Sequence, residues 1–341
     1  MSVNTEITRI QSAKADIAKA IKYREGSNVS SSLLSDTALM NAINNIEGVL
    51  HYNPRTGHYI SYNGDFYAKL CEYPLWFYCA TNYTIKLTNS SSGIASKTFK
   101  YATTTTTDAY EQPDLTGKSW STMTLGSQIS VNGGTFFCVK STSTTYVSNS
   151  SYNRYFTIGS SKYPVYCGGN IQSLMNMSTT LPSGASFRGL FKNNTASLKS
   201  CPLLPYKDLS SGYRVYNEMF YGCSNLEYPP ILPATVLGDY CYYSMFQQCQ
   251  SMKYFPDLPA PEFKPFCYSN MFSTVKKATR LKCMTYKNYV SSATNNWLNY
   301  NTPYFGFFIS PHPEIFSRNQ SGIPNGWIIM TNEYNIRQYN N

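Results

Sequence analysis

Charged side chains are scarce in this sequence, because Asp, Glu, Lys and Arg together make up only 13% of the 341 residues. That is about half of the usual share. Eighteen Asp and Glu residues and three His residues (His51, His58 and His312) must supply any acid–base or metal chemistry. None of them stands at a spacing typical of a metal-ligand set or a catalytic pair. We therefore expect no catalytic residues, no metal and no cofactor.

Long apolar runs are also missing. The longest, at residues 73–80 and 304–309, fall far short of the roughly 20 residues that span a bilayer. Residues 1–20 lack the basic region, the apolar stretch and the cleavage site of a secretory signal. We expect no membrane insertion, and synthesis in a cytoplasm.

Paired cysteine motifs are absent, since none of the ten cysteines forms a C-x-x-C pair. Without a secretion signal, we expect free, buried thiols in place of a disulfide framework or a zinc site. The net charge of +10 reflects scarce acids and not runs of Lys or Arg. This pattern does not favour nucleic acid as a partner and allows only a weak attraction to anionic surfaces such as acidic glycans.

A repeat of about 26 residues occupies the second half of the chain. Its markers are the Met-Phe pairs at 219–220, 245–246 and 271–272, together with Cys223 and Cys249. Leu-Pro pairs follow at 204–205, 232–233 and 258–259, and Leu190-Phe191 resembles a degenerate first copy. Such a period is typical of a leucine-rich-repeat solenoid, in which the Phe, Cys and Leu form core columns. The third copy loses the pattern after Phe272, so we expect an irregular last turn.

Residues 65–170 are rich in Thr, Ser, Tyr and Val and are interrupted by Gly and Asn. Many short strands at this spacing predict a β-sandwich. The expected strands are Tyr83–Leu87, Ser96–Tyr101, Gln128–Val131, Thr135–Lys140, Arg154–Ile158 and Tyr163–Cys167. The threonine tract at 103–107 is predicted to be an exposed loop.

Two helices are predicted near the N-terminus, at residues 5–24 and from about residue 35 to 46, from apolar residues at helical spacing. The first helix presents the candidate virion-anchor or oligomer contacts, which are Ile7, Ile10, Ile17 and Ile21. The alternative is that both helices simply cap the sandwich.

The predicted fold is therefore multidomain: a short α-helical segment, an all-β sandwich, and a leucine-rich-repeat solenoid with a cap. The expected domains are a helical anchoring or oligomerisation segment (1–50), a linker (51–64), the sandwich (65–170), the solenoid (171–285) and the C-terminal cap (286–341).

The repeat, F-x-x-C-x-x-L/M followed by L-P, resembles that of the BspA-like leucine-rich-repeat proteins. Similar proteins of gut bacteria and their phages carry, in order, segments like Gly168–Met175 and Phe187–Thr195 and a tail like Asn296–Leu298 and Gly322–Trp327. The opening Thr5–Ile21 is similar to the start of many tail and minor structural proteins of tailed phages, including crAss-like or similar gut phages. The resemblance implies a virion protein made in the bacterial host cytoplasm, with no signal peptide.

The function that this resemblance implies is a head or tail fibre subunit without enzymatic activity. Residues 1–50 would bind other virion proteins, a homotrimer is expected, and the repeats would bind a glycan or protein on the host surface. The candidate adhesion face is Tyr221, Tyr228, Tyr242, Tyr243 and Tyr254, since tyrosine rings stack on sugars and pack on proteins. The alternatives are a purely architectural virion part, a bacterial BspA-like surface adhesin and a tail-borne glycan depolymerase. The depolymerase is the least favoured, because no carboxylate of the repeats recurs at an equivalent position.

Overall fold

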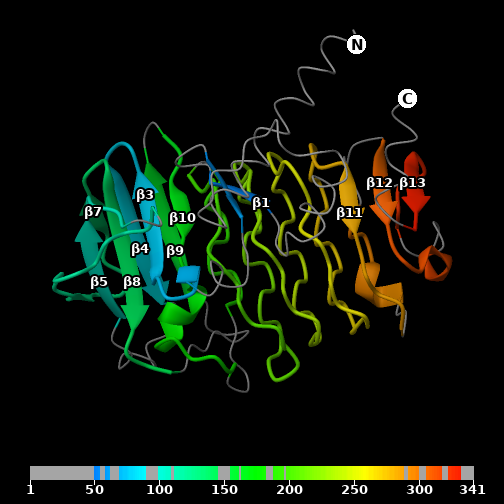
Figure 1. The fold of residues 1–341 in the computed structure, drawn as a ribbon, viewed down its shortest axis with the longest axis horizontal. Helices are drawn as coiled ribbons and strands as arrows, with labels where there is room; N and C mark the ends of the chain where they lie inside the picture. Colours follow the sequence, from blue (N-terminus) through cyan, green and yellow to red (C-terminus); the bar gives the residue numbers. More distant parts are fainter. Residues whose placement is uncertain are drawn as a thin grey trace, which may run out of the picture. The chain divides into compact units, whose positions relative to one another are not determined.

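The computed structural model describes residues 50–53, 58–61, 69–89, 99–108, 111–144, 154–160, 163–181, 187–195, 197–287, 291–298, 305–316 and 322–331. The chain divides into two compact units, Met1–Glu72 and Tyr73–Asn341. The described part is mostly β, with several antiparallel sheets and a small parallel sheet (Figure 1). In this part, no helix has the length and apolar composition needed to cross a membrane.

The first unit contains an antiparallel hairpin. Strand β1 (Leu50–Asn53) pairs with β2 (His58–Ser61), with Leu50 opposite Ser61. The segment 51–64, expected to be a linker, therefore includes two strands. The two predicted helices, with Ile7, Ile10, Ile17 and Ile21, lie outside the described residues.

The second unit begins with two antiparallel sheets. The five-stranded sheet has the order β10-β3-β8-β5-β6 and the three-stranded sheet the order β7-β4-β9. The strands are β3 (Leu75–Cys79), β4 (Tyr83–Asn89), β5 (Phe99–Thr104), β6 (Ser121–Met123), β7 (Ile129–Val131), β8 (Thr135–Ser141), β9 (Arg154–Ser160) and β10 (Tyr166–Gly168).

All six predicted strands are present with shifted ends, while β3 and β6 were not predicted as strands. The threonine tract is not wholly an exposed loop, because Thr103 and Thr104 belong to β5 and Thr104 is buried. Strand β3 could not be predicted from an alternation of apolar and polar residues, because its side chains are apolar on both faces. Phe77 enters the main core, whereas Trp76 packs with Phe136 in a second cluster.

The two sheets share one core. The Phe77 ring of β3 lies 5.0 Å from the Phe156 ring of β9, centroid to centroid. The Tyr83 hydroxyl of β4 donates hydrogen bonds to the carbonyls of Phe77 and Thr135 in the other sheet. These contacts fix the two sheets against each other.

A short 3-10 helix, η3 (Ile171–Met175), follows β10 and closes one end of this core. Asn170 caps it, and the Ser173 hydroxyl accepts from the Leu75 amide and donates to the Val139 carbonyl, each at 2.9 Å. The turn into η3 requires glycine at residue 169, where φ is 72° and a Cβ atom would collide with the Pro74 carbonyl. This close approach explains the Gly-Gly-Asn sequence at this point.

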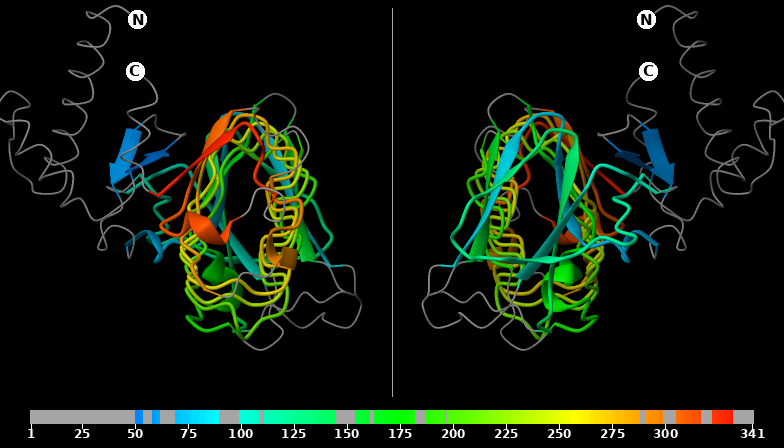
Figure 2. Two further views of the ribbon diagram at one scale, coloured as in Figure 1. Left: turned by 90° about the vertical axis from the view of Figure 1, so that its right-hand side faces the viewer. Right: turned by 90° about the vertical axis from the view of Figure 1, so that its left-hand side faces the viewer.

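After η3 the chain runs in successive turns that lie side by side (Figures 1 and 2). We call these turns coils 1 to 4, at residues 187–212, 213–238, 239–264 and 265–287. Main-chain hydrogen bonds join each coil to the next. The amides of Phe191, Phe220 and Phe246 donate to the carbonyls of Met219, Met245 and Met271, at 2.9, 3.0 and 2.9 Å. Equivalent residues are therefore stacked in register.

One side of each coil is a chain of tight turns, which we call the turn face (residues 187–194, 213–223, 239–249 and 265–275). Here alternate amides bond to the next coil, and the amides between them bond three residues back, as Met219 does to Tyr216. Every fourth residue has a positive φ, for example Glu218 (54°), Gly222 (75°) and Gln248 (68°). This geometry pairs the main-chain amides of a segment that is neither helix nor strand.

Two columns of stacked rings fill the core behind the turn face. One contains Phe156, Phe191, Phe220, Phe246 and Phe272, with centroids 5.3–5.9 Å apart. The other contains Phe187, Tyr216, Tyr242, Tyr268 and Trp297, with centroids 5.7–6.4 Å apart. The first column begins on β9, so the sheets and the coils share one continuous core.

Asn194 joins the sheets to the coils. It stands three residues after Phe191, where the next two coils have Cys223 and Cys249 after their phenylalanines. Those thiols each donate to the phenylalanine carbonyl of the preceding coil at 3.1 Å. Asn194 donates to the equivalent Phe156 carbonyl at 2.8 Å and also accepts from the Ile158 amide. Asn194, which replaces the cysteine in the first copy of the repeat, therefore links coil 1 to strand β9 by hydrogen bonds.

The third sequence copy lacks the cysteine after Phe272 but keeps the buried apolar positions of the repeat. Val275 takes the cysteine position and Ala278 the leucine position, and both are fully buried. The parallel sheet of β11 (Arg280–Lys282), β12 (Gly306–Ile309) and β13 (Trp327–Met330) then extends the stack. Two 3-10 helices, η4 (Ser291–Thr294) and η5 (Pro313–Ile315), lie between these strands in the sequence.

Candidate functional site

The side of the coils across the core from the turn face carries parallel bridges between coils, for example Ser200 with Tyr228 and Leu258 with Cys283. We call it the bridge face (residues 197–203, 224–232, 250–258 and 276–283). The rings of Phe255 and Phe272 meet in the core, with centroids 4.6 Å apart. Since Phe255 belongs to the bridge segment and Phe272 to the turn segment, outward side chains on the two faces point in opposite directions.

Tyr221 and Tyr243, two of the five predicted tyrosines, are half-buried on the turn face. The Lys192 ammonium lies 4.7 Å from the centroid of the Tyr221 ring and 3.0 Å from the Glu218 carboxylate, which Arg188 also approaches at 3.7 Å. The Tyr243 hydroxyl accepts a hydrogen bond from the Asn270 amide group. The single Glu218 carboxylate is thus shared by two cations on this part of the turn face.

Further aromatic residues, outside the predicted set of five tyrosines, lie on the same face. Arg214, Tyr240 and Phe266 occupy equivalent left-handed positions in coils 2 to 4. The Arg214 guanidinium lies 4.9 Å from the Tyr240 ring, which stacks on Phe266 at 4.6 Å. Tyr213 is 53% exposed beside them. Their spacing of 26 residues was available in the sequence, but only the left-handed backbone turns them outward.

Tyr228 and Tyr254 lie at equivalent positions of the bridge face, in coils 2 and 3. The Lys253 ammonium donates a hydrogen bond to the Tyr228 hydroxyl at 2.8 Å and lies 4.6 Å from its ring centroid. Tyr254 is 36% exposed. The rings on this face are therefore combined with cations from neighbouring coils.

An ion-pair chain crosses three coils of the bridge face. The Glu227 carboxylate accepts from Lys199 of coil 1 and from Lys253 of coil 3, each at 2.7 Å. Partial burial acts to raise the pKa of Glu227, but the two lysines outweigh it and hold the pKa below its ordinary value. The pKa of Lys253 is raised by its hydrogen bonds to Glu227 and Tyr228. Both groups are therefore charged at neutral pH.

Tyr242, by contrast, is not part of a binding face. It is 1% exposed and stacks between Tyr216 and Tyr268 in the core. The dipeptide Tyr242-Tyr243 hides this difference, because the turn face buries consecutive pairs of side chains. Cys241 and Tyr242 are such a pair, whereas Tyr243 is half-buried. The predicted set of five tyrosines thus divides into two per face and one in the core.

The ten cysteines are all free thiols, as expected, and eight of them are buried. Burial raises the pKa of the Cys223 and Cys241 thiols to about 12 and that of Cys283 to about 11. A thiol with so high a pKa is a poor nucleophile at neutral pH. These cysteines pack and donate weak hydrogen bonds.

Outside the coils, an open hollow of about 300 Å³ lies beside β4, β7 and β9. Polar side chains line it, including those of Asn82, Thr84, Ser130 and Ser160. No group of three His, Cys, Asp or Glu in the described part of the chain is placed to bind a metal.

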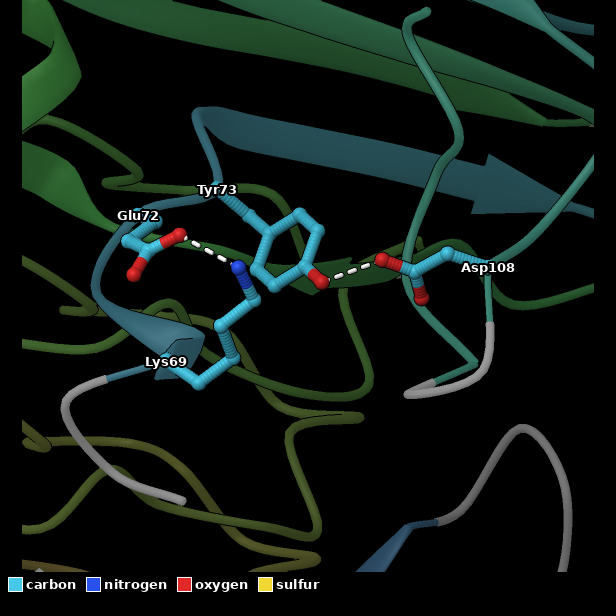
Figure 3. A network of polar contacts seen from close by, with 4 residues as sticks. All are labelled: Lys69, Glu72, Tyr73 and Asp108. Carbon is cyan, nitrogen blue, oxygen red and sulfur yellow. Dashed lines mark hydrogen bonds and ion pairs between the residues drawn. The ribbon is translucent and has the colours of Figure 1, made fainter. Parts of the chain in front are cut away.

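Figure 3 shows two polar contacts that belong to different units and are structural. In the second unit, the Tyr73 hydroxyl donates to the Asp108 carboxylate, and Asp108 also accepts from the Gln112 amide. Gln112 in turn accepts from the Trp76 indole, so this network braces the segment after β5 against β3. In the first unit, Lys69 pairs with Glu72 at 2.6 Å on an exposed surface.

Comparison of the chain with protein-family models, with curated proteins and with solved structures gives no match.

Proposed function

We propose that this chain is a non-enzymatic adhesion subunit of a phage virion, a head or tail fibre or appendage protein, made in the cytoplasm of a bacterial host. In this proposal the two antiparallel sheets form a sandwich, and the coils form a leucine-rich-repeat solenoid that presents the binding faces. Residues 1–50 attach the subunit to other virion proteins, and the subunits form a homotrimer.

The observation that carries this proposal is the column made by Tyr228 and Tyr254 on the bridge face. Register between coils places these two rings at equivalent outward positions, beside Lys253. Tyrosine offers a large contact area at a low entropic cost, and its ring stacks on sugars or packs on protein. Three copies of a weak site would bind a surface much more tightly than one, because later contacts become intramolecular.

Binding of the tagged full chain to intact gut-bacterial cells tests the adhesive role. We expect the double variant Tyr228→Ala/Tyr254→Ala to lose most of the binding. The matched control is Tyr163→Ala, an exposed tyrosine outside the coils, which should bind like the unchanged chain. Equal binding by all three proteins would refute the role of the bridge face. No binding by the unchanged chain would favour the purely architectural role.

Two further measurements test the attachment and the trimer. A chain that lacks residues 1–64 should still bind cells but fail to join the virion, and loss of cell binding would contradict this division of labour. Light scattering at micromolar concentration should give three times the chain mass of 38.5 kDa. A monomeric mass would refute the trimer.

A further inference from the structure

We propose that the bridge face binds an anionic polysaccharide, a chain of sugars that carry carboxylate groups. This inference rests on the proposed adhesive function and names the class of its receptor. It starts from an imbalance of charge on this face. The bridge face carries six cations and two carboxylates, namely Lys199, Lys253, Lys276, Lys277, Arg280 and Lys282 against Glu227 and Asp257.

The two carboxylates of this face are already engaged. Glu227 bridges Lys199 and Lys253, and Asp257 pairs with Arg280 at 3.3 Å. Lys276 and Lys277 are exposed, and no carboxylate among the described residues lies within ion-pair distance of them. The net charge of this face is therefore positive, and Lys276 and Lys277 are the cations that an anionic partner can reach.

The placement of the cations suits a polymer better than a single small anion. Glu227 links coils 1, 2 and 3, and Lys276 and Lys277 begin the bridge segment of coil 4, at the positions of Gln250 and Ser251 in coil 3. Positive charge thus occurs in coils 1, 3 and 4 and is concentrated in coil 4. An extended ligand with several negative charges gains attraction at more than one coil.

The aromatic rings on the same face favour a sugar as the carrier of these charges. Tyr254 is 36% exposed in the column that contains Tyr228. A pyranose ring presents C–H groups on one side, which pack on an aromatic face, and hydroxyl groups at its rim, which reach the lysines. The turn face also combines rings with a cation, but its excess of positive charge is smaller, because Arg188, Lys192 and Arg214 are matched there by two carboxylates, Glu218 and Asp239.

Binding of the full chain to sodium polygalacturonate, with neutral dextran as the comparison, tests the proposal. We expect polygalacturonate to bind and dextran not to bind. We also expect the affinity to fall about tenfold when NaCl rises from about 0.05 M to about 0.5 M, because salt screens exposed charges. Absence of binding to polygalacturonate, or equal binding of both polymers, would overturn the proposal.

Matched charge variants locate the site. Lys276→Gln/Lys277→Gln should weaken polygalacturonate binding about tenfold. The control, Lys207→Gln/Lys287→Gln, removes the same charge from exposed positions outside the bridge face and should change binding less than twofold. Equal losses in both variants would show unspecific attraction and refute the site. An oligonucleotide that binds more tightly than polygalacturonate would point to nucleic acid and also refute it.

The outcomes separate this inference from the adhesive function. Cell binding that persists in Lys276→Gln/Lys277→Gln, without any affinity for polygalacturonate, would refute the anionic receptor and leave adhesion intact. Polygalacturonate binding without cell binding would refute the adhesive function alone.

Discussion

The antiparallel sheets and the coils of the second unit differ in how their aromatic side chains pack in the core. In the sheets, strands of unrelated sequence pair, and the rings meet at varied angles, such as 20° between Tyr101 and Phe137 and 57° between Phe77 and Phe156. In the coils, equivalent residues pair, and the rings of Phe220, Phe246 and Phe272 are within 2° of parallel. Because the sequence repeats, the core of the coils consists of columns in which each side chain contacts the equivalent side chains of the neighbouring coils.

The largest expected effect comes from breaking a column at its centre. Phe220→Ala removes a ring that stacks on Phe191 and on Phe246. We expect a loss of about 3–5 kcal/mol in the free energy of unfolding, because the cavity opens against two coils. Urea denaturation measures it, and Tyr213→Ala, at an exposed position, should cost under about 0.5 kcal/mol. Similar losses in the two variants would contradict the column model.

The junction between the two regions gives a somewhat smaller effect. Asn194→Leu leaves the Ile158 amide and the Phe156 carbonyl without this partner, and each such loss costs about 1–3 kcal/mol. Asn194→Cys introduces the residue that coils 2 and 3 have at this position. It should restore only the hydrogen bond donated to the Phe156 carbonyl. We therefore expect its midpoint of thermal unfolding to lie between those of Asn194→Leu and the unchanged chain. Identical midpoints for the two variants would show that the thiol does not replace the amide.

The buried thiols predict a loss of stability at alkaline pH. The folded-state pKa values of Cys283 (about 11), Cys223 and Cys241 (both about 12) lie above the value of about 8.5 for an unfolded thiol. Stability is therefore complete below about pH 8 and falls as the pH rises, by up to about 1.4 kcal/mol per pH unit for each thiol. Urea midpoints between pH 7 and 10.5 measure this slope. Cys223→Ala should make it shallower, and an unchanged slope would contradict the assignment.

The smallest expected effect concerns the left-handed positions of the turn face. Thr274 has φ of 69°, a value unfavourable for a β-branched residue. Thr274→Asn should raise the free energy of unfolding by about 0.5–1 kcal/mol, because asparagine adopts this conformation more readily. Thermal unfolding measures the change, and Thr285→Asn, at a buried position, serves as the destabilising counterpart. A lower midpoint for Thr274→Asn would show that its packing outweighs the strain.

The sequence predicted those parts of the fold that depend on residue type at fixed spacing. The Phe and Cys columns followed from the 26-residue period, and most strands followed from composition and turns. The period could not reveal that Val275 and Ala278 continue the repeat, because any small apolar side chain fills those positions. It could not assign a role to Asn194 either, since its partners lie on a strand 36–38 residues away.

The candidate site was less accessible to prediction than the fold. Choosing tyrosines of the repeats identified Tyr228 and Tyr254 but also included the core residue Tyr242. Which side chains of the turn face point inward depends on the residues with a left-handed backbone. Glu, Gln and Tyr rarely adopt this conformation, so their presence at such positions could not be predicted from the sequence. The cations of the bridge face were missed although four of them lie within residues 276–282, because this segment follows the last recognisable copy of the repeat.

The column that ends in Trp297 allows fluorescence to report whether neighbouring coils remain stacked. Tyr216, Tyr242 and Tyr268 lie in line, with centroids 5.7 Å apart, and Trp297 follows at 6.4 Å. At such separations, excitation absorbed by a tyrosine passes from ring to ring and is emitted by the indole. Separation of the coils interrupts this relay. In a variant that keeps Trp297 as its one tryptophan, the tyrosine-sensitised part of the emission would thus fall as the neighbouring coils come apart.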